Sequence, residues 1–185
     1  MTFKITNWWN SIDKVNFFII IFFVIIGIIL SFSTNKNFSF FNKHLIYSFS
    51  SILLMILISF LEIKVLRRLS LIGIIIFTLM LLYILILDFE IKGSKRWLKI
   101  FGLSIQASEF IKPFFLMLSA WFLTKGIEGQ KGYLSILFIS FFIISGLIIL
   151  QPDFGMTFLF AASFFCQLFI AGLSLILVIV AFFML

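Results

Sequence analysis

The feature that most constrains this chain is its succession of long apolar runs, separated by short connections that carry most of the charge. With 63% hydrophobic and 11% charged residues, a soluble domain of this size could not bury so much apolar surface. The runs must therefore use lipid as their solvent. Because backbone groups in hydrocarbon must bond within their own segment, and no run alternates like a barrel strand, each run predicts a transmembrane helix.

A membrane crossing needs roughly 20 apolar residues. Six runs can serve, the last of them short, at about 17–34, 45–61, 71–88, 108–124, 133–150 and 156–170. A seventh run begins at 174 and stops partway, at 185. The sequence therefore predicts an all-α, polytopic transmembrane helix bundle with six complete spans and a truncated seventh. We expect residues 1–185 to form a single transmembrane domain, the N-terminal part of a longer protein.

The charge balance narrows the possible partners. A net charge of +7 would suggest nucleic acid in a soluble domain, but here the cations lie between apolar runs. They indicate anionic lipid headgroups or an anionic lipid-linked substrate, and no nucleic acid is expected. One His and one Cys cannot form a His/Cys metal cluster, and no dinucleotide or nucleotide motif is present. No cofactor is evident, and a divalent metal is left open.

The orientation follows from where Lys and Arg lie relative to the spans. Seven are on the side of the N-terminus: Lys4, Lys14, Lys64, Arg67, Arg68, Lys125 and Lys131. Seven are on the other side: Lys36, Lys43, Lys92, Lys95, Arg96, Lys99 and Lys112. The two counts are equal, so they do not decide the orientation unless the five cations of residues 91–112 are held there by function and are set aside. The remainder then predicts a cytoplasmic N-terminus, with residues 91–112 and 151–155 facing outward.

Residues 91–112 are the first candidate site, because cations this close to hydrocarbon are costly to place. Arg96 offers a planar fork suited to phosphate oxygens, Lys95 adds a point charge, and Trp97 suits the membrane interface. The structural alternative is snorkelling and interface anchoring alone.

The start of the fourth predicted helix adds Gln106, Ser108, Glu109 and Lys112. Ser108 is a candidate helix cap, and Glu109 complements the helix dipole. Glu109 and Lys112 are three residues apart, so they share a helix face and can pair. That pair indicates either a polar groove in the bundle or a purely structural ion pair.

The break between the fifth and sixth spans supplies Gln151 and Asp153 in the sequence Gln-Pro-Asp-Phe-Gly. Asp153 is the only acid after Glu128. It is predicted either to cap the following helix or to belong to the same outward-facing polar site.

Several motifs in order resemble the shape, elongation, division and sporulation (SEDS) family of membrane glycosyltransferases, and its division branch (FtsW) more than its elongation branch (RodA). They are KGSKRW at 92–97, SIQASEFIK at 104–112, LQPDFG at 150–155 and QLFIAGL at 167–173. The similarity runs along most of the chain, and the combination of motifs is specific. One departure is Ala107, where the family usually has proline. This change should not remove a functional side chain.

The resemblance implies a peptidoglycan glycosyltransferase of the bacterial cytoplasmic membrane that polymerises lipid II during cell division and releases undecaprenyl pyrophosphate. It also implies a class B penicillin-binding transpeptidase and other division proteins as partners. The family has about ten helices, and its proposed catalytic aspartate follows the seventh, beyond Leu185. Asp153 does not match that aspartate, so the catalytic residue is unassigned, and we expect residues 1–185 alone to be inactive.

Nine residues are expected to bind substrate or shape the site: Lys95, Arg96, Trp97, Gln106, Ser108, Glu109, Lys112, Gln151 and Asp153. Two other functions remain open. A flippase or transporter of the lipid-linked precursor would also place charges inside a bundle. A scaffold of the division complex would use the helices to bind a partner. An outward loop carrying an aspartate after the seventh helix favours the enzyme, whereas inverted repeats favour transport.

Overall fold

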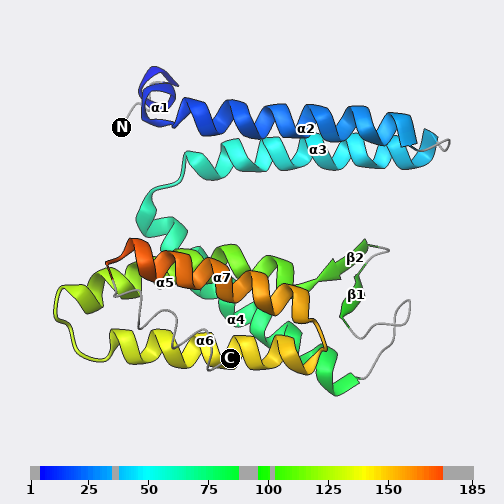
Figure 1. The fold of residues 1–185 in the computed structure, drawn as a ribbon. Coiled ribbons are helices and arrows are strands. Elements are labelled where there is room, and N and C mark those ends of the chain that lie inside the picture. Colours follow the sequence, from blue (N-terminus) through cyan, green and yellow to red (C-terminus); the bar gives the residue numbers. More distant parts are fainter. Residues whose placement is uncertain (1–4, 35–37, 88–95, 101–102, 173–185) are drawn as a thin grey trace. The chain divides into compact units, whose positions relative to one another are not determined.

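The computed structural model describes residues 5–34, 38–87, 96–100 and 103–172 of the chain. These form two compact units, with a boundary between Glu62 and Ile63. The first unit holds α1 (Ile5–Ser11), α2 (Lys14–Thr34) and α3 (Phe38–Ser59). The second holds α4 (Ile63–Leu87), β1 (Trp97–Ile100), β2 (Leu103–Gln106), α5 (Ala107–Ile127), α6 (Tyr133–Leu150) and α7 (Phe154–Ile170) (Figure 1).

The first unit is a pair of membrane-length helices, α2 and α3, with the short α1 at one end (Figure 1). Asp13 begins α2, because its Oδ1 accepts the backbone N–H groups of Val15 and Asn16 at 3.0 and 3.2 Å. The indole of Trp8 donates to Ser59 Oγ at 2.8 Å, so α1 is fastened to the end of α3.

The second unit packs four helices around a core of phenylalanine rings. Phe115 of α5, Phe141 of α6, and Phe160 and Phe164 of α7 are almost fully buried. The rings of Phe141 and Phe164 stack with centroids 4.3 Å apart. Transmembrane helices associate through such packing, because lipid tails provide no hydrophobic driving force for helix–helix association. The core fixes α5 against α4, α6 and α7.

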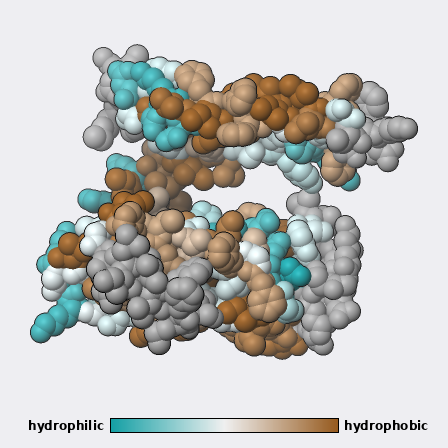
Figure 2. Space-filling view, in the orientation of Figure 1, coloured by the Kyte–Doolittle hydropathy of each residue, from teal (hydrophilic) through white to brown (hydrophobic). Residues whose placement is uncertain are grey.

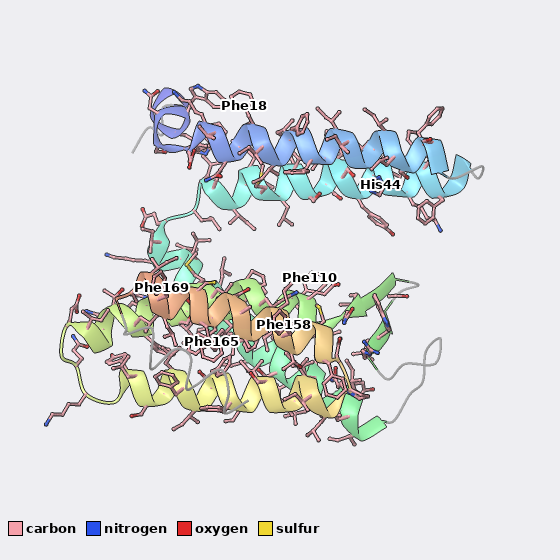
Figure 3. All side chains as sticks on the ribbon, in the orientation of Figure 1. Phe18, His44, Phe110, Phe158, Phe165 and Phe169 are labelled. Atoms are coloured by element: carbon pink, nitrogen blue, oxygen red, sulfur yellow. The ribbon has the colours of Figure 1, made fainter. Side chains whose placement is uncertain are left out.

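Five of the described helices, α2 to α6, are long and apolar enough to cross a membrane, and α7 is shorter. Large apolar side chains cover their outer faces; Phe18, Phe110, Phe158 and Phe169, labelled in Figure 3, are among the exposed ones. Figure 2 shows this hydrophobic surface along much of α2. The predicted all-α polytopic bundle is confirmed. The expected seventh run, 174–185, lies outside the described residues.

Two predicted boundaries differ from the structure. The predicted turn at 62–70 is mostly helix, because α4 begins at Ile63, and α3 begins at Phe38 and not near Leu45. Hydropathy marks where lipid begins, whereas Lys and Arg are good helix formers and extend a helix past that level. The predicted span 133–150 coincides with α6.

A small antiparallel hairpin, which the sequence analysis did not predict, lies at one end of the second unit (Figure 1). Its register pairs Trp97 with Gln106 and Ile100 with Leu103. Gln106 is both the last residue of β2 and the N-cap of α5, so the hairpin passes into the helix with no connecting residue. The hairpin therefore holds Arg96, which precedes β1, near the start of α5.

Candidate functional site

The candidate site is at the hairpin end of the second unit, where α6 ends and α5 and α7 begin. Asp153 is the N-cap of α7, and its Oδ1 accepts the backbone N–H of Met156 at 3.3 Å. Its carbonyl oxygen accepts the hydroxyl of Thr157 at 2.9 Å. The prediction that Asp153 caps the following helix is confirmed.

The Asp153 carboxylate also joins this helix to the hairpin. Arg96 Nη1 lies 3.1 Å from Oδ1 in an ion pair, and Gln106 Nε2 donates to Oδ2 at 2.8 Å. The Asp153 side chain is only 5% exposed, and that of Arg96 is 35% exposed. A buried carboxylate needs such partners to offset its desolvation. Both oxygens of Asp153 are therefore occupied by donors.

Gln151 fastens the same junction on its other side. It is 1% exposed, and its Nε2 donates to the carbonyl oxygen of Leu81 on α4 at 3.1 Å. Gln151 and Asp153 thus flank Pro152 and bind two different parts of the unit, α4 and the hairpin. The residues between α6 and α7 therefore hold both α4 and the hairpin at this end of the unit.

Lys112 and Glu109 lie at the same end, in the first turns of α5, but they form no ion pair. The purely structural ion pair, one of the two alternatives for Glu109 and Lys112, is therefore not formed. Lys112 is half-buried, and its Nζ lies 3.7 Å from Sδ of Met156, whereas Glu109 is exposed. Helix spacing places the two side chains on one face, but α7 packs close enough to draw Lys112 across. Lys112 has no carboxylate partner among the described residues.

Ser108 does not cap α5. The N-cap is Gln106, whose side chain makes no capping bond because it donates to Asp153 instead. Ser108 is 1% exposed, and its Oγ has no hydrogen-bond partner among residues 96–100 and 103–172 or the other described ranges. Arg96 Nε is likewise buried without a described partner. Trp97 is half-buried beside Arg96. Lys95, the remaining predicted site residue, lies outside the described residues.

The arrangement separates a structural acid from available cations. Asp153 is buried, and both of its carboxylate oxygens are bound by donors, so it suits positioning better than proton abstraction. Arg96 keeps part of its guanidinium exposed, and Lys112 is a cation without a described carboxylate partner. Such groups can hold an anion. The sequence analysis did not single out Leu81, Met156 or Thr157, because a backbone carbonyl, a thioether and a hydroxyl carry no distinctive signal in an apolar run.

Membrane-length helices with a polar, cationic junction at one end define a multi-pass membrane protein with a candidate anion-binding site. A family model described as "Cell cycle protein", that of FtsW, RodA and SpoVE, matches residues 9–185. The chain belongs to this family, as the motifs predicted.

Curated relatives agree with the family assignment. The chain is 28% identical over 182 residues to a probable peptidoglycan glycosyltransferase FtsW of Caulobacter vibrioides, covering 91% of this chain and 46% of that protein. It is 32% identical over 177 residues to the FtsW similarly described from Wigglesworthia glossinidia brevipalpis, covering 88% and 46%. The chain spans about half the length of these relatives.

Solved structures share the fold. The crystal structure of the rod shape determining protein RodA of Thermus thermophilus matches with a TM-score of 0.80 and 23% identity, over 95% of this chain and 58% of that one. A chain from a peptidoglycan synthase complex, studied for the coordination of polymerization and crosslinking, matches with a TM-score of 0.76 and 22% identity, over 94% and 52%. The predicted RodA-like polytopic architecture is thus confirmed.

Proposed function

We propose that the full-length protein is a peptidoglycan glycosyltransferase that polymerises lipid II during cell division, and that the hairpin end of the second unit helps to hold the substrate. Family membership and the FtsW relatives support this proposal. The observation that carries it is the half-buried Lys112, without a described carboxylate partner, at the same end of the unit as Arg96. A lipid-linked sugar carries a diphosphate that two such cations can neutralise.

The roles of the nine site residues then divide into three groups. Arg96, Lys95 and Lys112 supply positive charge to the diphosphate, and exposed Glu109 is placed to contact sugar hydroxyls. Gln106, Gln151 and Asp153 position these groups by fixing the hairpin and the junction between α6 and α7. Half-buried Trp97 shapes the surface beside Arg96, and buried Ser108 shapes the packing at the start of α5.

In the reaction, an acceptor sugar hydroxyl attacks the anomeric carbon of the donor after losing its proton to a carboxylate. The bond from that carbon to the diphosphate oxygen breaks, and undecaprenyl pyrophosphate leaves with its charge neutralised by cations. We place the base outside residues 1–185, because the family resemblance puts the catalytic aspartate after the seventh helix and Asp153 is held by Arg96 and Gln106. Residues 1–185 alone should therefore make no glycan.

The proposal includes a location and a partner. The protein lies in the bacterial cytoplasmic membrane with its N-terminus in the cytoplasm, so the hairpin end faces outward. This orientation rests on the Lys and Arg distribution once the five cations of residues 91–112 are assigned to the site. A class B penicillin-binding transpeptidase is the proposed partner, which is consistent with the likeness to a chain of a complex that polymerises and crosslinks.

The experiment measures glycan chain growth from radiolabelled lipid II by the purified full-length protein. Lys112→Met removes a cation without leaving a described carboxylate unpaired, and we expect it to reduce growth about tenfold or more. Lys131→Met, on the exposed connection between α5 and α6, is the matched control and should leave growth unchanged. Arg96→Ala should also lower growth without preventing membrane insertion.

Equal activity of Lys112→Met and the wild type would contradict a diphosphate role for this end of the unit. Detectable glycan from residues 1–185 would contradict the placement of the base. If the full-length protein moves lipid II across vesicles but makes no glycan, the flippase is the correct alternative.

A further inference from the structure

At the end of the second unit opposite the hairpin, three helices bring a cation against two aromatic rings. The guanidinium carbon of Arg67, in the second turn of α4, lies 4.5 Å from the ring centroid of Trp121 on α5. Tyr133, the first residue of α6, meets Trp121 edge-on with ring centroids 5.5 Å apart. In Figure 1 the connection between α5 and α6 is at the left of this unit and the hairpin is at the right.

This group has donors that lack acceptors. The indole Nε1 of Trp121 is buried and has no hydrogen-bond partner in the part of the chain that the structure describes. Arg67 forms no ion pair with a carboxylate of the described residues. Glu128, the acid of the neighbouring connection, is taken by Lys125 at 2.6 Å. Trp121 Nε1 is closed to solvent, whereas Arg67 is half-buried and has no described carboxylate, so its guanidinium is the group that can take an acceptor from outside the described residues.

The surrounding charge is also positive. Lys64 and Arg68 are exposed on the first turns of α4, whose first turn contains no acid, although Glu62 immediately precedes it. The N-terminus of a helix carries a partial positive charge, so cations in its first turns are unfavourable unless an anion lies near them. The cluster of Lys64, Arg67, Arg68 and Trp121, which we call the α4 cluster, therefore has an excess of positive charge.

We propose that the α4 cluster binds the phosphate group of an anionic phospholipid. The cluster lies at the end of membrane-length helices, where the acceptors that a bilayer supplies are phosphodiester oxygens. The guanidinium of Arg67, supported on the indole face, donates along its edge to two of these oxygens. Lys64 and Arg68 favour a headgroup with no amine, because an ammonium would add a further cation. This inference is independent of the proposed glycosyltransferase activity.

The test is native mass spectrometry of the full chain in non-ionic detergent, titrated with phosphatidylglycerol. Arg67→Gln should weaken binding of the tightest lipid about tenfold. Lys131→Gln removes the same charge from the exposed connection between α5 and α6 at the same end, and should change the affinity by less than about twofold. Trp121→Phe keeps a ring beneath Arg67 but weakens the cation–π attraction that supports the guanidinium, and should weaken binding by a smaller factor than Arg67→Gln.

Two further ligands separate the sources of phosphate, since phosphatidylcholine tests the need for net negative charge and inorganic phosphate tests a soluble ligand. Equal effects of Arg67→Gln and Lys131→Gln would overturn the proposal, since they would show a diffuse charge effect. Inorganic phosphate that displaces phosphatidylglycerol at equal concentration would also overturn it. If Arg67→Gln does not fold, Arg67→Lys decides: retained wild-type affinity overturns the role of the guanidinium fork, and weaker binding supports it.

Discussion

Gln106 Nε2 donates to Asp153 Oδ2 across 2.8 Å, although 47 residues separate the two in the sequence. This bond joins the end of the hairpin to the start of α7. Arg96 reaches the other oxygen of the same carboxylate. The position of Arg96, one of the cations proposed to bind the substrate, thus depends on the buried carboxylate of Asp153. Asp153 is not itself proposed to contact the substrate.

Replacing Asp153 with Asn should destabilise the protein by about 2 kcal/mol or more, because Arg96 loses its counter-ion and an amide donor then faces other donors. The measurement is thermal unfolding in detergent, made for Asp153→Asn, Arg96→Gln and the double variant. The double variant should lose clearly less than the sum of the two single losses. Additive losses would contradict a direct pair.

Replacing Gln151 with Leu should cost about 1 kcal/mol, because the hydrogen bond from Nε2 to the Leu81 carbonyl is lost in a dry environment. Gln130→Leu, at an exposed position in the connection between α5 and α6, is the matched control and should be nearly neutral. Thermal unfolding curves that coincide for the two variants would show that Gln151 does not hold α4 to the junction.

Replacing Gly73 with Ala should lower stability by about 1–3 kcal/mol through overpacking. An added Cβ would lie 2.7 Å from Cγ of Phe114, whose ring covers this glycine where α4 meets α5. Phe114→Leu should partly rescue the variant by making room. Gly146→Ala is the control: nothing lies within 4 Å of its added Cβ, so higher helix propensity should leave stability unchanged or raised.

The proposed orientation predicts opposite labelling of two engineered cysteines. In a Cys166→Ser background, which removes the only native thiol, Ser104→Cys should react with an impermeant maleimide added to intact spheroplasts. Lys131→Cys should react only after the membrane is opened. Both native residues are exposed, so differential burial does not explain a difference. The reverse pattern would place the hairpin end in the cytoplasm.

Much of the helical architecture could be predicted, because the backbone of each apolar run must form its hydrogen bonds within the run when it lies in lipid. The run 133–150 was placed to the residue, because Gly132 and Pro152 bound it in the sequence. The start of α4 was missed because its charged first turns lie beyond the hydrocarbon and still favour helix. The hairpin was missed because its strands are only four residues long, too short for the alternation of Lys99 and Ser104 with apolar neighbours to stand out.

The site residues were found individually, whereas their contacts were not. Asp153 was predicted as a cap because a short acidic side chain just after a helix-breaking proline commonly caps the next helix. Its bonds to Arg96 and Gln106 depend on the packing of α7 against the hairpin, which spacing along the chain does not encode. The expected pair of Glu109 and Lys112 failed for the same reason, since Met156 approaches from another helix.

The direct passage from β2 into α5 sets a strict limit on chain length at this point. One residue inserted after Gln106 would rotate Glu109 and Lys112 by about 100° around the helix axis relative to Arg96. We therefore expect related chains to vary at this junction by substitution and to keep its length unchanged.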